Sequence, residues 1–318
     1  MLTEYYNAAR RGAALAEMDW FGIMKVTGSE RVSWLQGMVT NDIQKLATGE
    51  GCYAAHLTPQ GKIVAHMHIW LDDDAVWLSL ERATLTKLAG AFDKLLIMED
   101  VQIADVSEEY DILSVIGPNG GSVLESWLGE TLNLNGVYKH RKFENCRVLV
   151  SDLGYEVWVS RGQADKMLRS LAQSGATAID QGTWDVLRTE AGLPVYGVDI
   201  DETTTMPEIG ERGISYEKGC YIGQEVVAKV KYIGHVNRRF VGLTLEGQDL
   251  PQSRSVVRKE GKDVGYVTTT LFSPGRNRPI ALGFVNRGAY VPGTNVEVVS
   301  DAKTLRATIV DLPFVREA

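Results

Sequence analysis

The chain has 318 residues, which is enough for about two or three domains that each bury a core. Hydrophobic residues make up 44% and charged residues 23%, an ordinary globular composition that excludes collagen-like and broadly disordered chains. A net charge of −8 argues against a general polyanion-binding surface. No apolar run reaches the roughly 18 residues needed to span a bilayer, and the three cysteines are too few for a disulfide framework. We therefore expect a soluble protein of the reducing cytoplasm with no membrane partner.

The pattern in the first part of the chain predicts helices that alternate irregularly with antiparallel strands. Helical spacing of apolar residues predicts an amphipathic helix over residues 3–18, and start and stop signals at Ser29 and Gly37 predict a short one. Strands at 53–57, 63–71 and 75–80, joined by turns at 58–61 and 72–74, predict an antiparallel meander. A helix at 85–96, strands near 101–106 and 110–116, and a helix near 120–127 follow. The irregular alternation favours an α+β fold over a doubly wound sheet.

In the second part of the chain, the pattern of predicted elements changes near residue 240. Strands at 147–150 and 156–159 precede helices at 164–173 and 182–191, while residues 226–232 fit a helix or a strand. Short strands then follow at 241–245, 264–272, 280–285, 296–299 and 305–310, separated by turns that contain Gly, Pro and Asp. This pattern predicts a separate C-terminal β-barrel of about 80 residues.

The most distinctive stretch is EKGCYIGQE at residues 217–225. Gly219 and Gly223 give the backbone freedom on both sides of Cys220, so the thiol could be held in an unusual position beside Lys218. A nearby ammonium favours the reactive thiolate. Alternatively, Cys220 is a small buried hydrophobe in a tight turn.

Other polar features have both a functional and a structural interpretation. No acidic residue lies between Glu225 and Glu246, where the chain carries Lys229, Lys231, His235, Arg238 and Arg239. These side chains could bind carboxylates or phosphates, or they could form a solvated face.

His66 and His68 share one face of a predicted strand, but metal ligation needs a further ligand, and we predict no metal site. The sequence also lacks GxGxxG after a strand, GxxxxGK[ST] and GxSxG, which excludes nucleotide-loop and hydrolase sites of those types.

Several motifs together resemble the YgfZ branch of the glycine-cleavage T-protein (aminomethyltransferase) family. They are LRTEAGLPVYGVDIDE at 187–202, PE at 207–208 and KGCYIGQE at 218–225. The match extends to LQG at 35–37 and TND at 40–42, and in the barrel to GYVT at 265–268, SP at 273–274 and ALG at 281–283. It thus covers nearly the whole chain, and KGCYIGQE in particular resembles YgfZ and not the T-protein proper.

The resemblance implies a ring of three domains around a central channel that binds tetrahydrofolate or a derivative. Residues 1–237 would form the folate-binding α+β region from two intertwined subdomains, the second at roughly 25–105, with mixed and antiparallel sheets and helices. Residues 238–318 would form the C-terminal β-barrel.

The resemblance also implies two cofactor-binding residues. Glu156, in GYEV at 154–157, stands where the family places its pterin carboxylate, which can accept two adjacent N–H donors in bidentate fashion. Arg188 matches a family arginine near the pterin. Alternatively, Glu156 is an outward-facing strand residue, and Arg188 forms an ion pair with Glu190 or Asp185.

One departure from the family pattern bears on catalysis. The aminomethyltransferases carry an Asp-Asp pair whose second member handles the proton of the reactive folate nitrogen, whereas Ala65 and His66 stand here and no carboxylate remains. A histidine can move a proton, but it does not provide the same fixed anion for a cationic iminium. Folate binding for another purpose is therefore expected ahead of glycine cleavage.

The YgfZ branch is associated with assembly or repair of iron–sulfur enzymes and with dependent tRNA modification. The resemblance thus implies a cytoplasmic folate-binding accessory protein with iron–sulfur client proteins, in which Cys220 is the functional thiol and Lys218 its neighbour. The alternative is a tetrahydrofolate-dependent aminomethyltransferase with altered catalytic residues, so whether the chain is an enzyme stays open. A third hypothesis, RNA held by the basic stretch, is disfavoured by the net charge of −8.

Overall fold

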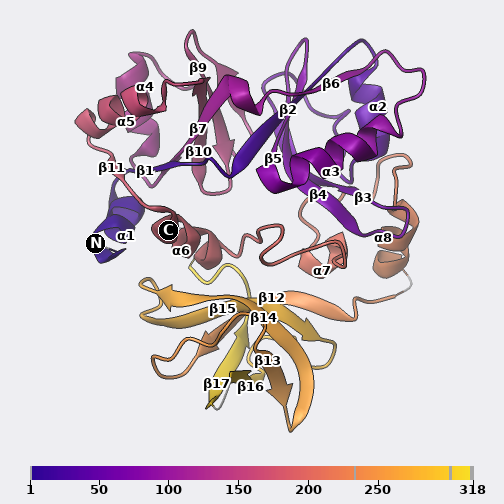
Figure 1. Ribbon diagram of the computed structural model, residues 1–318, viewed down its shortest axis with the longest axis vertical. Helices are drawn as coiled ribbons and strands as arrows, with labels where there is room; N and C mark the ends of the chain where they lie inside the picture. Colours follow the sequence, from indigo (N-terminus) through magenta and orange to yellow (C-terminus); the bar gives the residue numbers. More distant parts are fainter. Residues whose placement is uncertain (1, 233, 301–302, 316–318) are drawn as a thin grey trace. The chain divides into compact units, whose positions relative to one another are not determined.

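The computed structural model describes residues 2–232, 234–300 and 303–315, and the chain forms two compact units. The first unit comprises Met1–Thr183 and Arg212–Gln224, and the second comprises Trp184–Glu211 and Glu225–Ala318. The first unit combines helices with one antiparallel and one mixed sheet, and a closed barrel dominates the second unit (Figure 1). The predicted α+β class with a C-terminal β-barrel is confirmed. Among the described residues, no helix is both long enough and apolar enough to cross a membrane.

A five-stranded sheet in the first unit contains the predicted meander. Its order is β3 (Gly51–Leu57), β4 (Ile63–Leu71), β5 (Val76–Glu81), β2 (Phe21–Thr27) and β6 (Gln102–Asp105), and all neighbours are antiparallel. Alternate residues of these strands, such as Met24 and Leu78, form a core with α2 (Arg31–Met38) and α3 (Arg82–Asp93). One face of the sheet is thereby covered by helices.

The first unit also holds a six-stranded sheet. Its order is β11 (Thr177–Ala178), β1 (Ala14–Glu17), β7 (Tyr110–Ile116), β10 (Gly154–Ser160), β9 (Cys146–Ser151) and β8 (His140–Lys142). A short 3-10 helix, Ser107–Glu109, precedes β7. Helices α4 (Gly120–Leu128) and α5 (Ala164–Gln173) lie beside this sheet (Figure 1). Residues on one of its faces, such as Leu113 and Val157, pack with these helices.

The predicted helix over residues 3–18 is wrong in its second half. Helix α1 spans Leu2–Arg11, and residues 14–17 form strand β1. Strand β1 pairs with β7 on one side and β11 on the other, and its first three side chains are fully buried. The apolar spacing of residues 14–17 would also fit a helix. Pairing with a strand on each side stabilises the extended conformation more.

The other faces of the two sheets in the first unit meet each other. The indole rings of Trp77 on β5 and Trp158 on β10 lie 6.1 Å apart between centroids. The imidazole of His68 on β4 reaches the carboxylate of Asp152 in the turn between β9 and β10. Polar groups are consequently buried between the sheets, which is where the candidate site lies.

The second unit contains the barrel and short helices before it. Helix α6 (Gln181–Ala191) enters it from the first unit, and α7 (Met206–Ile209) begins with a capping box made by Thr205 and Glu208. Residues 226–232, which the sequence left undecided, belong to helix α8 (Gln224–Tyr232).

The barrel closes in the order β12 (Arg238–Leu245), β15 (Arg278–Asn286), β14 (Lys262–Ser273), β13 (Val256–Lys259), β16 (Asn295–Ser300) and β17 (Lys303–Val310). The five predicted strands are confirmed, and β13 is an additional one. Leu243, Val267 and Ile309 are among the side chains that fill its core.

Candidate functional site

One face of the five-stranded sheet carries a row of buried polar side chains. Tyr53, His68 and Ser79 are direct cross-strand neighbours on β3, β4 and β5. His66 and Glu81 lie two residues along β4 and β5, so they share the same face. The two histidines therefore share a face as predicted, but that face is buried against the second sheet and is not a sheet surface in water.

Glu156 faces this row from β10 and is only 3% exposed. Its Oε2 accepts a hydrogen bond of 3.3 Å from Nε1 of Trp158, and its Oε1 lies 3.7 Å from Nδ1 of His68. Burial raises the pKa of Glu156, and the His68 charge and the Trp158 hydrogen bond offset this only in part. Glu156 is thus an inward-facing carboxyl group and not the outward-facing strand residue of the alternative interpretation.

His68 joins Glu156 to a second carboxylate. Its Nε2 lies 2.9 Å from Oδ2 of Asp152, and Oδ1 of Asp152 accepts hydrogen bonds of 2.7 Å from the Tyr138 hydroxyl and 2.6 Å from Nη1 of Arg212. Burial alone would lower the pKa of His68, but the hydrogen bond and charge of Asp152 and the charge of Glu156 raise it. Burial alone would raise the pKa of Asp152, but the His68 hydrogen bond and charge hold it below its usual value. The imidazolium and the ionised carboxylate therefore stabilise each other.

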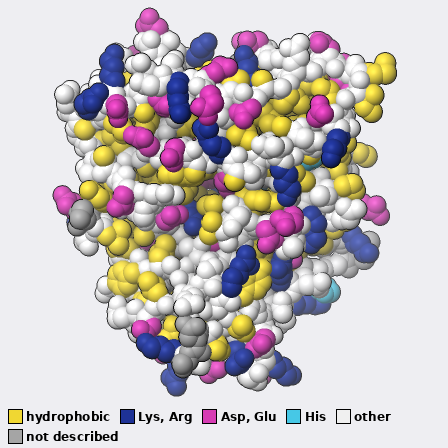
Figure 2. Space-filling view, viewed as in Figure 1, with side chains coloured by type: hydrophobic (Ala, Val, Ile, Leu, Met, Phe, Trp, Pro, Cys, Tyr) yellow, Lys and Arg dark blue, Asp and Glu magenta, His cyan; other side chains and the backbone are white. Residues whose placement is uncertain are grey.

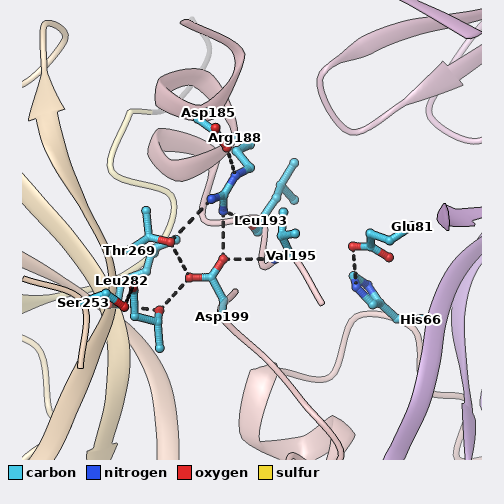
Figure 3. Close-up of polar contacts among 11 residues, drawn as sticks. His66, Glu81, Asp185, Arg188, Leu193, Val195, Asp199, Ser253, Thr269 and Leu282 are labelled. Atoms are coloured by element: carbon cyan, nitrogen blue, oxygen red, sulfur yellow. Dashed lines mark hydrogen bonds and ion pairs between the residues drawn. The ribbon is translucent and has the colours of Figure 1, made fainter. Parts of the chain in front are cut away.

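His66 has a carboxylate beside it that the sequence analysis did not anticipate. Its Nε2 lies 2.9 Å from Oε1 of Glu81 (Figure 3), and its Nδ1 lies 2.7 Å from the Tyr53 hydroxyl. Burial raises the pKa of Tyr53, so this phenol keeps its proton and can donate it to Nδ1. Positions 65 and 66 hold no carboxylate, as the sequence shows, but β5 places the carboxylate of Glu81 beside His66.

Arg188 lies in the second unit and has partners on all three nitrogens of its guanidinium. Nε donates to Asp185 at 2.7 Å, Nη1 to Asp199 at 2.8 Å, and Nη2 to Thr269 at 3.4 Å (Figure 3). The ion pair with Asp185 that was considered from the sequence is present. Arg188 therefore ties α6 to the following loop and to β14, and a contact with folate stays a prediction.

The two motifs at residues 35–42 and 218–225 contact each other although about 180 residues separate them. The Lys218 ammonium donates to the carbonyl groups of Gln36, Val39 and Asn41 at 2.6, 2.7 and 2.8 Å. Burial lowers the pKa of Lys218 to about 8. These bonds close the C-terminal end of α2, where unpaired carbonyl groups need donors.

Cys220 lies two residues after Lys218 and is exposed, whereas Cys52 and Cys146 are buried. Cys220 is therefore not the buried hydrophobe of the alternative interpretation. Its role as a functional thiol, and the influence of Lys218 on it, stay predictions.

The basic stretch meets acidic residues in the fold. Lys231 pairs with Glu211 at 2.8 Å, and Arg238 pairs with Glu208 at 2.9 Å, both within the second unit. On the face shown in Figure 2, Lys and Arg side chains are interspersed with Asp and Glu. This pairing reduces the positive charge that the stretch could offer to phosphates.

Comparisons with known proteins identify the family. The model described as the GCVT N-terminal domain matches residues 2–214, and the model described as the glycine cleavage T-protein C-terminal barrel domain matches residues 238–316. The chain belongs to the glycine-cleavage T-protein family. An aminomethyltransferase from Rippkaea orientalis is 30% identical over 334 residues, covering 99% of this chain and 89% of the relative. An aminomethyltransferase from Nostoc sp. is 27% identical and covers 100% of this chain and 88% of the relative.

The fold of the T-protein family is also found by structure comparison. The crystal structure of the glycine cleavage system aminomethyltransferase T from Bartonella henselae matches with a TM-score of 0.91 at 22% identity, covering 99% of this chain and 90% of that chain. At this identity the likeness concerns the fold.

The residues between the sheets include groups that could meet the hydrogen-bond donors of a ligand. An ionised carboxylate has about four acceptor sites, and Glu156 uses two of them, one for the weak Trp158 bond and one for the Ser79 hydroxyl. Within residues 2–232, 234–300 and 303–315, Nδ1 of His68 is a buried atom without a hydrogen-bond partner. In that same part of the chain, no three His, Cys, Asp or Glu side chains are grouped to hold a metal ion. The carboxylate can therefore accept further N–H donors from a ligand.

Three groups of this cluster were missed from the sequence, namely Glu81, Asp152 and Arg212. Glu81 could have been found, because the turn at 72–74 sets the pairing of β4 with β5 and thereby places residue 81 opposite residue 66. Asp152 lies 84 residues from its partner His68, and Arg212 lies 60 residues from its partner Asp152. No local sequence pattern links either pair.

Proposed function

We propose that the chain binds tetrahydrofolate or a derivative and that Glu156 is the carboxylate that accepts the pterin N–H donors. The observation that supports this most is the buried carboxylate itself, which faces the polar row of the other sheet. A buried carboxylate with unused acceptor sites costs stability, and a ligand with paired N–H donors would repay part of that cost. When bound, the folate would carry a one-carbon unit.

The test of this proposal is calorimetric titration with tetrahydrofolate and with its 5-formyl derivative. Glu156→Gln keeps the shape of the side chain but removes the anion, so we expect its affinity to fall by about tenfold to a hundredfold. Glu109→Gln, an exposed change in the same unit, is the matched control and should bind as the native chain does. Absence of binding by the native chain, or equal binding by Glu156→Gln, would contradict the proposal.

We further propose that folate binding serves a YgfZ-type accessory function in iron–sulfur cluster assembly or repair and in dependent tRNA modification. Two features support this role. The KGCYIGQE loop exposes Cys220, and Lys218 holds the base of that loop on α2. Position 66 also carries a histidine where the transferases have their catalytic aspartate.

The accessory role is tested in cells that lack the native copy. Cys220→Ala should lower the activity of a cluster-dependent methylthiolating enzyme, while Cys146→Ala, which alters a buried thiol, is the control. Unchanged activity with Cys220→Ala would remove the role of the thiol.

A second candidate function is aminomethyl transfer with altered catalytic residues. Glu81 supports it, because it places a carboxylate 2.9 Å from Nε2 of His66, where His66 alone supplies none. The curated relatives named aminomethyltransferase support it as well. It predicts tetrahydrofolate-dependent ammonia release from an aminomethyl-lipoyl carrier, and Glu81→Gln should abolish that release. No turnover above background by the native chain would exclude this candidate.

A further inference from the structure

We propose that the imidazolium of His68 keeps the buried carboxylate of Glu156 ionised, which makes His68 a positioning residue of the site. The proposal rests on the folate binding proposed for Glu156, and it adds the group on which that binding depends. His68 itself need not touch the ligand.

The first step of the argument is that Glu156 would not hold a charge without a partner. Its side chain is 4% exposed, and its neutral neighbours are the Trp158 indole and the Ser79 hydroxyl. Transfer of a lone carboxylate out of water is so unfavourable that the group takes up a proton instead. An imidazolium whose Nδ1 is 3.7 Å away opposes that uptake.

The second step is that His68 is held in the charged state and in the required orientation. Nε2 lies 2.9 Å from Asp152, so the ring is fixed with Nδ1 directed toward Glu156. Asp152 is in turn kept ionised by the guanidinium of Arg212 at 2.6 Å. Charges thus alternate along one line of contacts, from the Arg212 cation through Asp152 and His68 to the Glu156 anion.

Two further titratable groups contact this line, the phenols Tyr53 and Tyr138, and the His66–Glu81 pair lies beyond Tyr53. Burial raises the pKa of both tyrosines that contact it, so they donate hydrogen bonds and carry no charge. The groups that face the pair from the packed elements are therefore Tyr53, Tyr138, Asp152 and Arg212.

The functional consequence concerns the two N–H donors of the ligand. An ionised carboxylate accepts with both oxygens, whereas a protonated one presents an O–H donor to one of them. Loss of the His68 charge would leave Glu156 protonated at a higher pH and so weaken binding over a wider range of pH.

The coupling can be measured without any folate. The chain has five histidines, so the Cε1–H resonance of His68 can be followed by NMR across pH and assigned by its loss in His68→Gln. Because coupling between two sites is reciprocal, Glu156→Gln should lower the titration midpoint of His68 by about one pH unit or more. Glu109→Gln should leave it in place. An unchanged His68 midpoint in Glu156→Gln would overturn the proposal.

The effect on binding is measured by titration with tetrahydrofolate over a range of pH. Native affinity should decline as the pH falls and Glu156 takes up its proton, and His68→Gln should move this decline upward by about 1–3 pH units. His68→Lys restores a cation and should move the decline back, while His235→Gln, at an exposed site in the second unit, should not alter it.

The two measurements separate the possible failures. If the affinity of His68→Gln for tetrahydrofolate depends on pH as that of the native chain does, the role of His68 is overturned. Absence of binding by the native chain at every pH would instead overturn the folate proposal, and the NMR titration would still decide whether His68 and Glu156 are coupled.

Discussion

Replacing Lys218 by Met is expected to destabilise the first unit by about 3 kcal/mol. The native ammonium donates to three carbonyl groups, those of Gln36, Val39 and Asn41, at 2.6 to 2.8 Å. Met keeps the length of the side chain but leaves these acceptors without their donor, at a cost of roughly 1–3 kcal/mol for each buried one. Part of this cost is recovered because the variant no longer buries a charge.

Tryptophan fluorescence during urea unfolding measures this change. Six of the seven tryptophans lie in the first unit, so the signal reports mainly on it. Lys45→Met is the matched control, because Lys45 lies in the same unit but is 66% exposed, and its variant should unfold at nearly the native urea concentration. An unfolding midpoint of Lys218→Met equal to the native one would refute the structural role of the ammonium.

The same variant separates the structural role of Lys218 from the predicted activation of Cys220. Cys220 is the exposed thiol, and burial raises the pKa of Cys52 to about 12 and that of Cys146 to about 11. A chromogenic disulfide should therefore react first with Cys220 in the folded chain. If Lys218 acts by holding the loop, the reaction will be as fast or faster in Lys218→Met. A slower reaction at native stability would favour activation of the thiolate.

Three further predictions concern other parts of the fold and the candidate site. Gly223→Ala should lower the free energy of unfolding by about 2 kcal/mol or more, because φ is +82° and a Cβ would stand 2.7 Å from a carbonyl oxygen. Gly219→Ala is the control, because a Cβ there has no atom within 4 Å and should be tolerated. Equal losses of stability in thermal unfolding of the two variants would refute this reasoning. Arg188→Met should cost about 3–5 kcal/mol in the second unit because it leaves the buried Asp199 carboxylate without its cation, and Arg188→Met with Asp199→Asn should recover part of that loss. The raised pKa of Glu156 means that the folded chain binds more protons than the unfolded chain between pH 4.5 and that pKa, so native stability falls as pH rises through this window. Glu156→Gln should lack that fall and should therefore be the more stable protein at neutral pH, whereas parallel stability curves of the two proteins would contradict the assignment.

Much of the fold could be predicted because its strands and helices are long and regularly patterned. The meander of β3, β4 and β5 follows from three strand-forming runs joined by the turns at 58–61 and 72–74, and helix α5 follows from helical spacing. Strands β8, β11 and β13 have only two to four residues, which is too short for a period to be seen. Strand β1 was assigned to a helix because its pairing partners are distant in the sequence.

The candidate site could be predicted only in part. Glu156 was found through the family resemblance, and its burial required the structure, because the alternation of β10 does not say whether its polar face meets water or another sheet. The pairing of His68 with Asp152 depends on how two sheets pack, and no spacing in the chain encodes that distance. Arg188 shows the converse: its sequence context suggested a ligand contact, whereas the fold engages every nitrogen of its guanidinium.

The most direct test of the central claim is a crystal structure of the chain with bound 5-formyl-tetrahydrofolate. We predict that both oxygens of Glu156 accept hydrogen bonds from adjacent N–H groups of the pterin, at about 2.7–3.0 Å, and that His68 remains between Glu156 and Asp152. A pterin bound elsewhere, with Glu156 still contacting only its protein neighbours, would contradict the claim.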